Sequence, residues 1–202
     1  MHPSLPLSLS VGPRDGETIT DRPNRAVRIL VSADAHLTIT WSRYGEGERG
    51  PDLHVHREHS DAFYVLDGTL TFALGSEGER TVRAPAGTVV VVPPDVAHAF
   101  RNDDTPDAVF LNVHTPDRGF ATYMRALRDG RPASFDSYDL PVDGTLPGDA
   151  AIVVPAGDGE PGPGPDTTVR YVGEDLVLTE EPGRITVAIP ASAGPDVVFV
   201  AG

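Results

Sequence analysis

Residues 54–68 of this 202-residue chain, HVHREHSDAFYVLDG, carry the pattern that decides its fold. His54 and His56 are two residues apart, so on an extended strand both imidazoles project from the same face. Asp61 begins a second, apolar run, which ends in Asp67-Gly68, a dipeptide typical of a hairpin turn. The stretch therefore predicts two short strands that bring two imidazoles and a carboxylate to one place.

Two imidazoles and a carboxylate suit a divalent metal ion of borderline or hard character. His98, on a later strand, is the candidate for a third imidazole. Asp61 is the candidate carboxylate, as a ligand, through a bridging water, or as a base outside the ligand set. Glu58 is the alternative carboxylate, and His114, on an apolar strand, is a further histidine that could face the same place. The other histidines are expected to be surface or hydrogen-bonded core residues: His2, His36 and His59.

Short β-branched and apolar runs, separated by turns, continue from residue 26 to residue 114. About eight to ten short strands at this spacing require an antiparallel sandwich or barrel. The predicted runs include 26–31, 37–44, 62–66, 69–74, 81–84, 88–92, 97–101 and 108–114. Asp67-Gly68 is expected to join 62–66 and 69–74 as a hairpin.

One helix is predicted after this all-β region. Thr115-Pro116 reads as an N-cap followed by proline at the first helical position. Gly130 lies where a C-terminal cap belongs. The side chains at helical spacing are Phe120, Tyr123, Met124 and Leu127. We expect this apolar stripe to pack against the outside of the sheet.

The composition argues against some classes of binding partner and limits the possible metal ligands. A formal net charge of −14 argues against nucleic acid and against anionic membrane surfaces, because both require basic patches. The chain has no cysteine, so a metal site must use histidine and carboxylate. No apolar run approaches membrane-spanning length, and the N-terminus is a poor signal peptide, so we expect a cytoplasmic protein.

The chain is expected to have three parts: a barrel with an N-terminal arm and a helix (1–130), a Pro/Gly-rich connection (131–167), and a C-terminal β extension (168–202). The strands of 168–200 are expected to pair with strands around residues 26–41, in the same barrel or in a homodimer partner. Residues 154–172 also echo residues 11–30, which favours a partial second repeat.

Two motifs in this order resemble those of the cupin superfamily. The first runs glycine, five residues, His-x-His, three or four residues, glutamate, six residues, glycine. Here aspartate replaces glutamate, and Gly47 lies one residue early for the leading glycine. The second runs glycine, five residues, Pro-x-Gly, two residues, histidine, three residues, asparagine, and Asp95 replaces its second glycine. The matching residues are His54, His56, Asp61, Gly68, Gly87, Pro93, His98 and Asn102.

The resemblance implies an antiparallel β-barrel of the jelly-roll type with one divalent metal ion on His54, His56, Asp61 and His98. The metal could be Fe, Mn, Ni, Co, Cu or Zn. The first motif and the residues after it are similar to those of quercetin 2,3-dioxygenase-like cupins. This similarity implies a metal-dependent dioxygenase that acts on a small organic molecule, with Asp61 as the catalytic base. The alternatives are a binding module without catalysis and a cupin isomerase or epimerase.

Overall fold

The computed structural model describes residues 9–11, 16–33, 37–155, 167–170, 177–181, 184–188 and 197–199. The chain divides into two compact units. One, here called the barrel unit, comprises Glu17–Asp158, and the other comprises Met1–Gly16 together with Gly159–Gly202.

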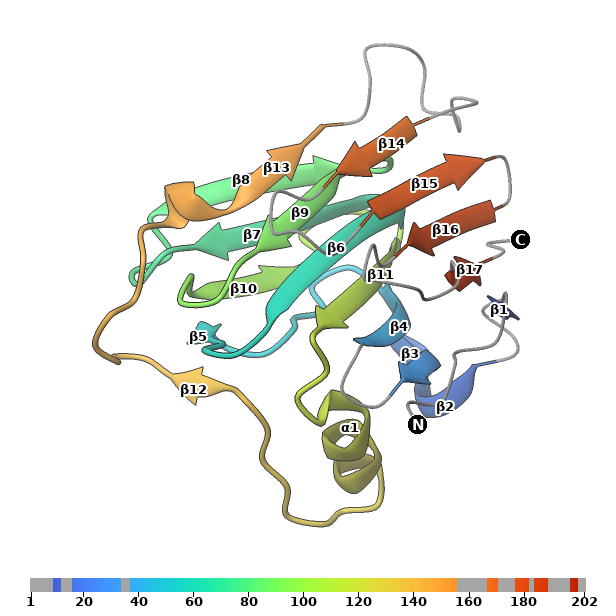
Figure 1. Ribbon diagram of the computed structural model, residues 1–202, viewed down its shortest axis with the longest axis horizontal. Coiled ribbons are helices and arrows are strands. Elements are labelled where there is room, and N and C mark those ends of the chain that lie inside the picture. The colour runs from blue at the N-terminus through green and yellow to red at the C-terminus, as the bar shows by residue number, and fades with distance from the viewer. Residues whose placement is uncertain are drawn as a thin grey trace, which may run out of the picture. The chain divides into compact units, whose positions relative to one another are not determined.

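The barrel unit contains two antiparallel sheets (Figure 1). The seven-stranded sheet has the order β13 (Ile152–Val154), β9 (Val89–Val92), β6 (Ser60–Asp67), β11 (Ala108–Thr115), β4 (Leu37–Tyr44), β3 (Arg25–Ala33) and β2 (Glu17–Arg22). The five-stranded sheet has the order β12 (Tyr138–Asp139), β5 (His54–Val55), β10 (His98–Arg101), β7 (Thr69–Leu74) and β8 (Arg80–Pro85). The predicted all-β jelly roll with one short helix is therefore confirmed.

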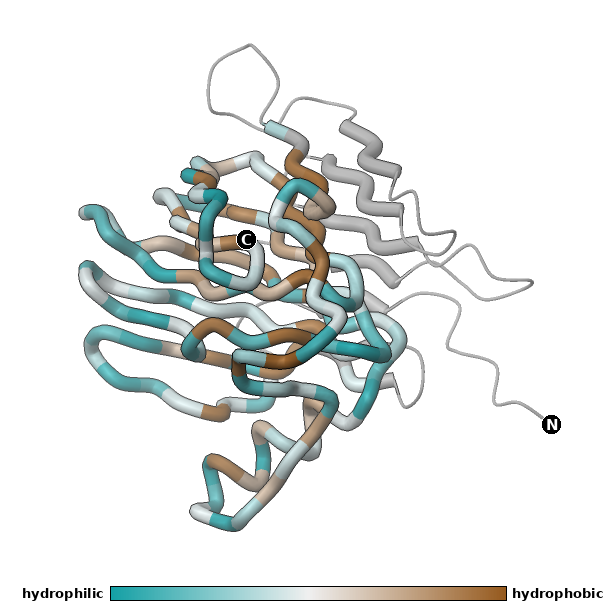
Figure 2. The backbone as a smooth tube through the Cα atoms, turned by 90° about the vertical axis from the view of Figure 1, so that its left-hand side faces the viewer, coloured by the Kyte–Doolittle hydropathy of each residue, from teal (hydrophilic) through white to brown (hydrophobic). Residues whose placement is uncertain are grey.

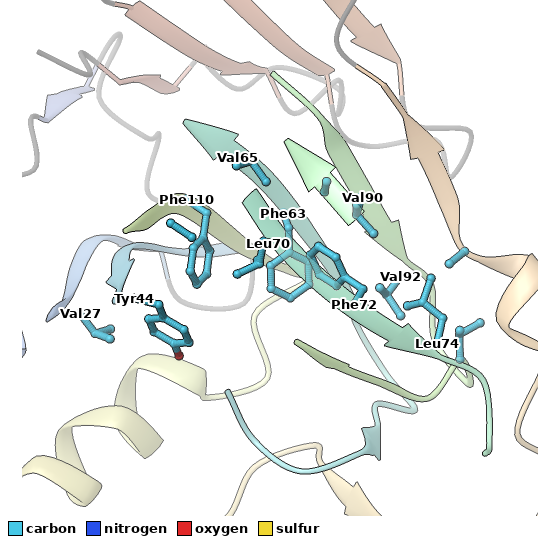
Figure 3. Packing of buried hydrophobic residues seen from close by; sticks show 14 of the residues in the cluster. Val27, Tyr44, Phe63, Val65, Leu70, Phe72, Leu74, Val90, Val92 and Phe110 are labelled. Atoms are coloured by element: carbon cyan, nitrogen blue, oxygen red, sulfur yellow. The ribbon is translucent and has the colours of Figure 1, made fainter. Parts of the chain in front are cut away.

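The core of the barrel unit lies between the two sheets. Phe63 from β6 and Phe72 from β7 meet edge to face, with ring centroids 4.9 Å apart. Figure 3 shows these rings together, with Phe110 and Tyr44 toward one end of the cluster and Val92 and Leu74 toward the other. Apolar segments lie along the strands of the barrel unit, while polar residues dominate many of the connecting loops (Figure 2). Burial of these side chains between the sheets is the main stabilising contribution.

The predicted hairpin at Asp67-Gly68 is wrong. β6 belongs to the seven-stranded sheet and β7 to the five-stranded sheet, so the turn carries the chain from one layer to the other. Gly68 has a φ of 69°, and a Cβ there would lie 2.4 Å from the carbonyl oxygen of Asp107. Glycine is thus required at this corner for close backbone approach as well as for its conformation. Sequence spacing cannot distinguish this corner from a hairpin.

Helix α1 (Phe120–Arg128) begins later than predicted. Gly119 is the N-cap, and the Asp117 carboxylate accepts hydrogen bonds from the backbone N–H groups of Gly119 and Phe120. Thr115 is the last residue of β11 and therefore not the cap. The predicted end is confirmed: Gly130 has a φ of 66°, and the C-terminal N–H groups bond back to Leu127 and Ala126 as in a Schellman motif.

The segment expected to be a connection contributes to the barrel unit. β12 pairs with β5, β13 pairs with β9, and a short 3-10 helix, η2 (Gly148–Ala150), lies between them in the chain. Among the described residues, no helix has the length and apolar character needed to cross a membrane.

The other unit has its own five-stranded sheet. Its order is β1 (Leu9–Val11), β17 (Val197–Phe199), β16 (Arg184–Ala188), β15 (Val177–Glu181) and β14 (Thr167–Arg170). The strands within 168–200 thus pair with one another and with β1, so the prediction that they pair with residues 26–41 of the same chain is wrong. Pairing with a partner chain stays a prediction. So does the partial repeat, because much of it lies outside the described residues.

Candidate metal centre

The structure brings His54, His56 and His98 together inside the barrel unit. His54 and His98 lie directly opposite each other on the paired strands β5 and β10, and His56 follows β5 by one residue. Their ring centroids are 4.4 Å apart for His54 and His98, 4.8 Å for His54 and His56, and 5.1 Å for His56 and His98. All three are buried. The predicted convergence of the three imidazoles is therefore confirmed. Metal binding by these residues stays a prediction.

Each of these three rings has its Nδ1 atom beside a backbone carbonyl oxygen. The acceptors are Asp52 for His54, at 2.8 Å, Asp136 for His56, and Val96 for His98, at 3.4 Å. A carbonyl oxygen only accepts, so the proton belongs on Nδ1 and the lone pair on Nε2. The Nε2 atom of His56 is buried and has no hydrogen-bond partner among the described residues. This arrangement of backbone acceptors is what fixes imidazoles as metal ligands.

Asp61 faces this triad from β6 in the other sheet. Its Oδ2 atom lies 3.3 Å from Nε2 of His98 and 3.6 Å from Nε2 of His56. The alternative carboxylate, Glu58, is exposed and pairs with Arg118 at 3.1 Å instead. The donor set of three imidazoles and one carboxylate, with an orphaned buried Nε2, fits a divalent metal ion.

Three residues outside the predicted set join the cluster: His59, His114 and Asp136. His59 and His114 are buried and lie 3.3 Å and 2.8 Å from Oδ1 of Asp61. The sequence could have indicated His59, because it precedes Asp61 by two residues and residues two apart on a strand face the same side. His114, named above as a further histidine that could face this place, does so as the cross-strand partner of Asp61 on β11. Asp136 comes from an irregular segment with no sequence signal.

Burial sets the charge of the cluster. It lowers the pKa of His54 to about 3, with help from the neighbouring imidazoles, and that of His114 to about 4. It also lowers the pKa of His98. Burial opposes the charged form of Asp61 as well, but the surrounding imidazoles outweigh it and hold the pKa of that carboxyl well below its usual range. The pKa of His59 is raised, because the carboxylates of Asp61 and Asp136 outweigh its burial.

These shifts predict that metal-free protein loses stability as the pH falls from about 6.5 to about 4. In this window the unfolded chain binds protons at His54 and His114 that the folded chain does not bind. His59, whose folded pKa is raised, opposes this trend near pH 6.5, where the unfolded chain is still gaining its proton, and adds no slope well below that pH. The stabilisation from Asp61 is lost only at the acidic end. Urea unfolding at pH 7, 6 and 5 measures the trend, and a flat or rising free energy of unfolding toward pH 5 would refute it.

Asp136 anchors the segment that carries His56 and His59. Its carboxylate accepts hydrogen bonds from the backbone N–H groups of Arg57, at 3.0 Å, and Glu58, at 2.6 Å, and lies 2.8 Å from Nδ1 of His59. Its backbone carbonyl accepts from Nδ1 of His56. One residue therefore positions both histidines.

Asp136→Ala is expected to weaken metal binding about 10- to 100-fold, the usual cost of removing a group that orients ligands. The matched control is Asp139→Ala, because Asp139 lies on the neighbouring strand β12 with an exposed side chain. Isothermal titration with Co²⁺ measures both affinities. Equal affinities in the two variants would show that Asp136 has no positioning role.

A cavity of about 310 Å³ opens beside the cluster, and His54, His56, Asp61 and His114 line it. Six aromatic side chains form much of its remaining wall: Tyr44, Phe100, Phe110, Phe120, Tyr123 and Phe135. The apolar stripe of α1 therefore lines this cavity, and one of its members, Met124, also packs against the core as predicted. The Phe120 ring stacks on His114 with centroids 3.6 Å apart.

Comparisons with known proteins agree with this architecture. Residues 40–114 match the family model described as a cupin domain. Quercetin 2,3-dioxygenase of Bacillus subtilis (strain 168) is 28% identical over 100 residues, which are 50% of this chain and 28% of the relative's length.

Two solved structures resemble part of this chain. KdgF from Halomonas sp. has a TM-score of 0.46 and 19% identity, over 54% of this chain and 94% of its own. The polyketide cyclase RemF from Streptomyces resistomycificus has a TM-score of 0.46 and 20% identity, over 66% of this chain and 85% of its own. The family match thus covers the part of the barrel unit that carries both motifs, residues 40–114.

Proposed function

We propose that the protein is a metal-dependent dioxygenase of the cupin type that acts on a small aromatic molecule carrying a hydroxyl group. The observation that carries the proposal is the position of the His54, His56 and His98 triad. The Nε2 atoms of His56 and His98 lie beside the Asp61 carboxylate, and His54, His56 and Asp61 line an aromatic-walled cavity. The similarity to a curated quercetin 2,3-dioxygenase supports the same class of reaction.

The cavity suits a flat apolar ligand with a few polar groups. Aromatic rings supply much of the wall, and the polar side chains of Thr40, Ser42 and Asn112 supply hydrogen-bonding groups. Arg25 also lines the cavity, and its guanidinium carbon lies 4.7 Å from the centre of the Tyr44 ring. A mostly apolar pocket with a small number of convergent polar groups is typical of a small-molecule site.

A divalent metal ion would supply a site that holds the substrate through its hydroxyl oxygen while the substrate reacts with O2. His54, His56 and His98 would hold it, with Asp61 beside them. The ionised Asp61 carboxylate would accept the proton of the substrate hydroxyl. Both atoms of O2 enter the product and the substrate supplies the four electrons, so the reaction requires no external reductant.

The test begins with the metal content of protein purified without added metal. Oxygen uptake with a flavonol and with simple catechols, followed by mass spectrometry after reaction under ¹⁸O2, then measures incorporation. We expect uptake with both labelled atoms in the product, and at least about 100-fold slower turnover in Asp61→Asn, the lower end of what a general base contributes. A metal-loaded protein that consumes no oxygen with any of these substrates would overturn the proposal.

A further inference from the structure

The two oxygens of Asp61 face two different groups of imidazoles. Oδ2 lies near Nε2 of His98 and of His56, at 3.3 Å and 3.6 Å. Oδ1 lies 2.8 Å from Nδ1 of His114 and 3.3 Å from Nε2 of His59. The carboxylate thus stands between the triad predicted by the motifs and a second pair of histidines that the motifs do not include.

The second group has the spacing of ligands around one ion. Nε2 of His59 and Nδ1 of His114 are 3.1 Å apart, and each lies about as far from Oδ1 of Asp61. Donor atoms about 2.0–2.1 Å from a metal, at tetrahedral or octahedral angles, are about 2.9–3.4 Å from one another. The three donors therefore fit a single cation without rearrangement.

His59 has the environment of a positioned ligand. Its Nδ1 atom lies 2.8 Å from Oδ2 of Asp136, so a proton on Nδ1 leaves Nε2 directed toward Asp61 and His114. A carboxylate behind a histidine in this way fixes the tautomer and raises the basicity of a metal ligand. His114 is held from the other side by the stacked Phe120 ring.

A single ion on the triad would use only part of this buried polar group, whose other members pair with one another and with Asp61. His54, His56, His98 and Asp61 already supply the four donors of such a site. His59, His114 and Asp136 are also buried. Burial of polar and charged groups is costly unless they are paired or bind a metal. A cation between His59, His114 and Asp61 would offset this cost directly.

We propose that the barrel unit holds a second divalent cation on Nε2 of His59, Nδ1 of His114 and Oδ1 of Asp61. The Asp61 carboxylate would bridge it to the ion on His54, His56 and His98. Carboxylate-bridged pairs of ions lie about 3.5–4 Å apart. Two nitrogens and one carboxylate favour a transition metal such as Mn, Fe, Co, Ni, Cu or Zn over Ca²⁺ or Mg²⁺. This inference rests on the proposed function in one respect: the first ion, on the triad, is the one proposed there.

Counting ions tests the proposal without any assay of activity. Wild-type protein is stripped with a chelator, reloaded with Mn²⁺, desalted and analysed by plasma mass spectrometry and by electron paramagnetic resonance. We expect two ions per chain and a spin-coupled spectrum. His114→Gln removes a ligand of the second position only, and His98→Gln removes a ligand of the first position only. Each variant is expected to keep one ion per chain and to give the spectrum of an isolated Mn²⁺.

The outcomes separate this proposal from the proposed function. One ion per wild-type chain overturns the second position, whatever the variants do. If that ion is lost in His98→Gln and kept in His114→Gln, the mononuclear centre stands. No ion in the wild type overturns both proposals. Two ions in the wild type that both persist in His114→Gln, with circular dichroism showing a folded chain, would place the second ion elsewhere and also overturn the inference.

Discussion

Replacing His98 with alanine is expected to weaken divalent-metal binding at the His54, His56 and His98 position by at least about 100-fold, more than the loss of a group that only orients a ligand. His98 is fully buried and lies directly opposite His54 in the five-stranded sheet. Its Nε2 atom is 3.3 Å from the Asp61 carboxylate, so alanine removes one of the donor atoms that face this carboxylate. Co²⁺ titration of chelator-treated protein, by calorimetry and by visible absorption, measures the loss.

His36→Ala is the control for this prediction, because it removes an imidazole that the motifs do not use. It lies outside the described residues, and its substitution is expected to leave Co²⁺ affinity unchanged. Circular dichroism of both metal-free variants checks that each remains folded. Similar losses in the two variants would show that histidine content, and not the motif position, determines metal binding.

Leu70→Ala is expected to lower the free energy of unfolding by about 2–5 kcal/mol. Leu70 lies on β7 with its side chain fully buried in the core between the two sheets, beside Phe63 and Phe72 in Figure 3. Truncation to alanine removes the transfer free energy of the side chain and leaves a cavity that close-packed neighbours fill only in part. Urea unfolding at neutral pH measures the change.

Leu146→Ala is the matched control, because it makes the same chemical change at a side chain that is 44% exposed. We expect it to change the free energy of unfolding by about 0.5 kcal/mol or less, as is usual for surface substitutions. Equal losses at the two positions would contradict the assignment of the core to the space between the sheets.

The sequence predicts the class of fold well because alternation and turn spacing are local signals. Runs such as 69–74 and 108–114 become β7 (Thr69–Leu74) and β11 (Ala108–Thr115) with small changes at their ends. The pairing of strands is not local. Asp67-Gly68 has the composition of a hairpin turn, yet its neighbours belong to different sheets, because long-range pairing with β11 and β10 decides where β6 and β7 lie.

The same limit applies to the site. Spacing within two short motifs identifies His54, His56, Asp61 and His98, while the pairing of β10 with β5 and the packing of the two sheets bring them together. His114 lies next to Asp61 only through the antiparallel register of β11 on β6. Asp136 reaches His56 and His59 from a loop about 80 residues away. No period or motif marks such a residue, so its role emerges only from the folded chain.

The central claim is that His54, His56 and His98 hold a divalent metal ion beside Asp61. Anomalous diffraction from crystals grown with Co²⁺, recorded on both sides of the cobalt absorption edge, tests it most directly. We predict a strong peak about 2.1 Å from the Nε2 atoms of all three histidines. Data of good quality with no peak among these imidazoles, or with cobalt bound only to histidines elsewhere in the chain, would contradict the account.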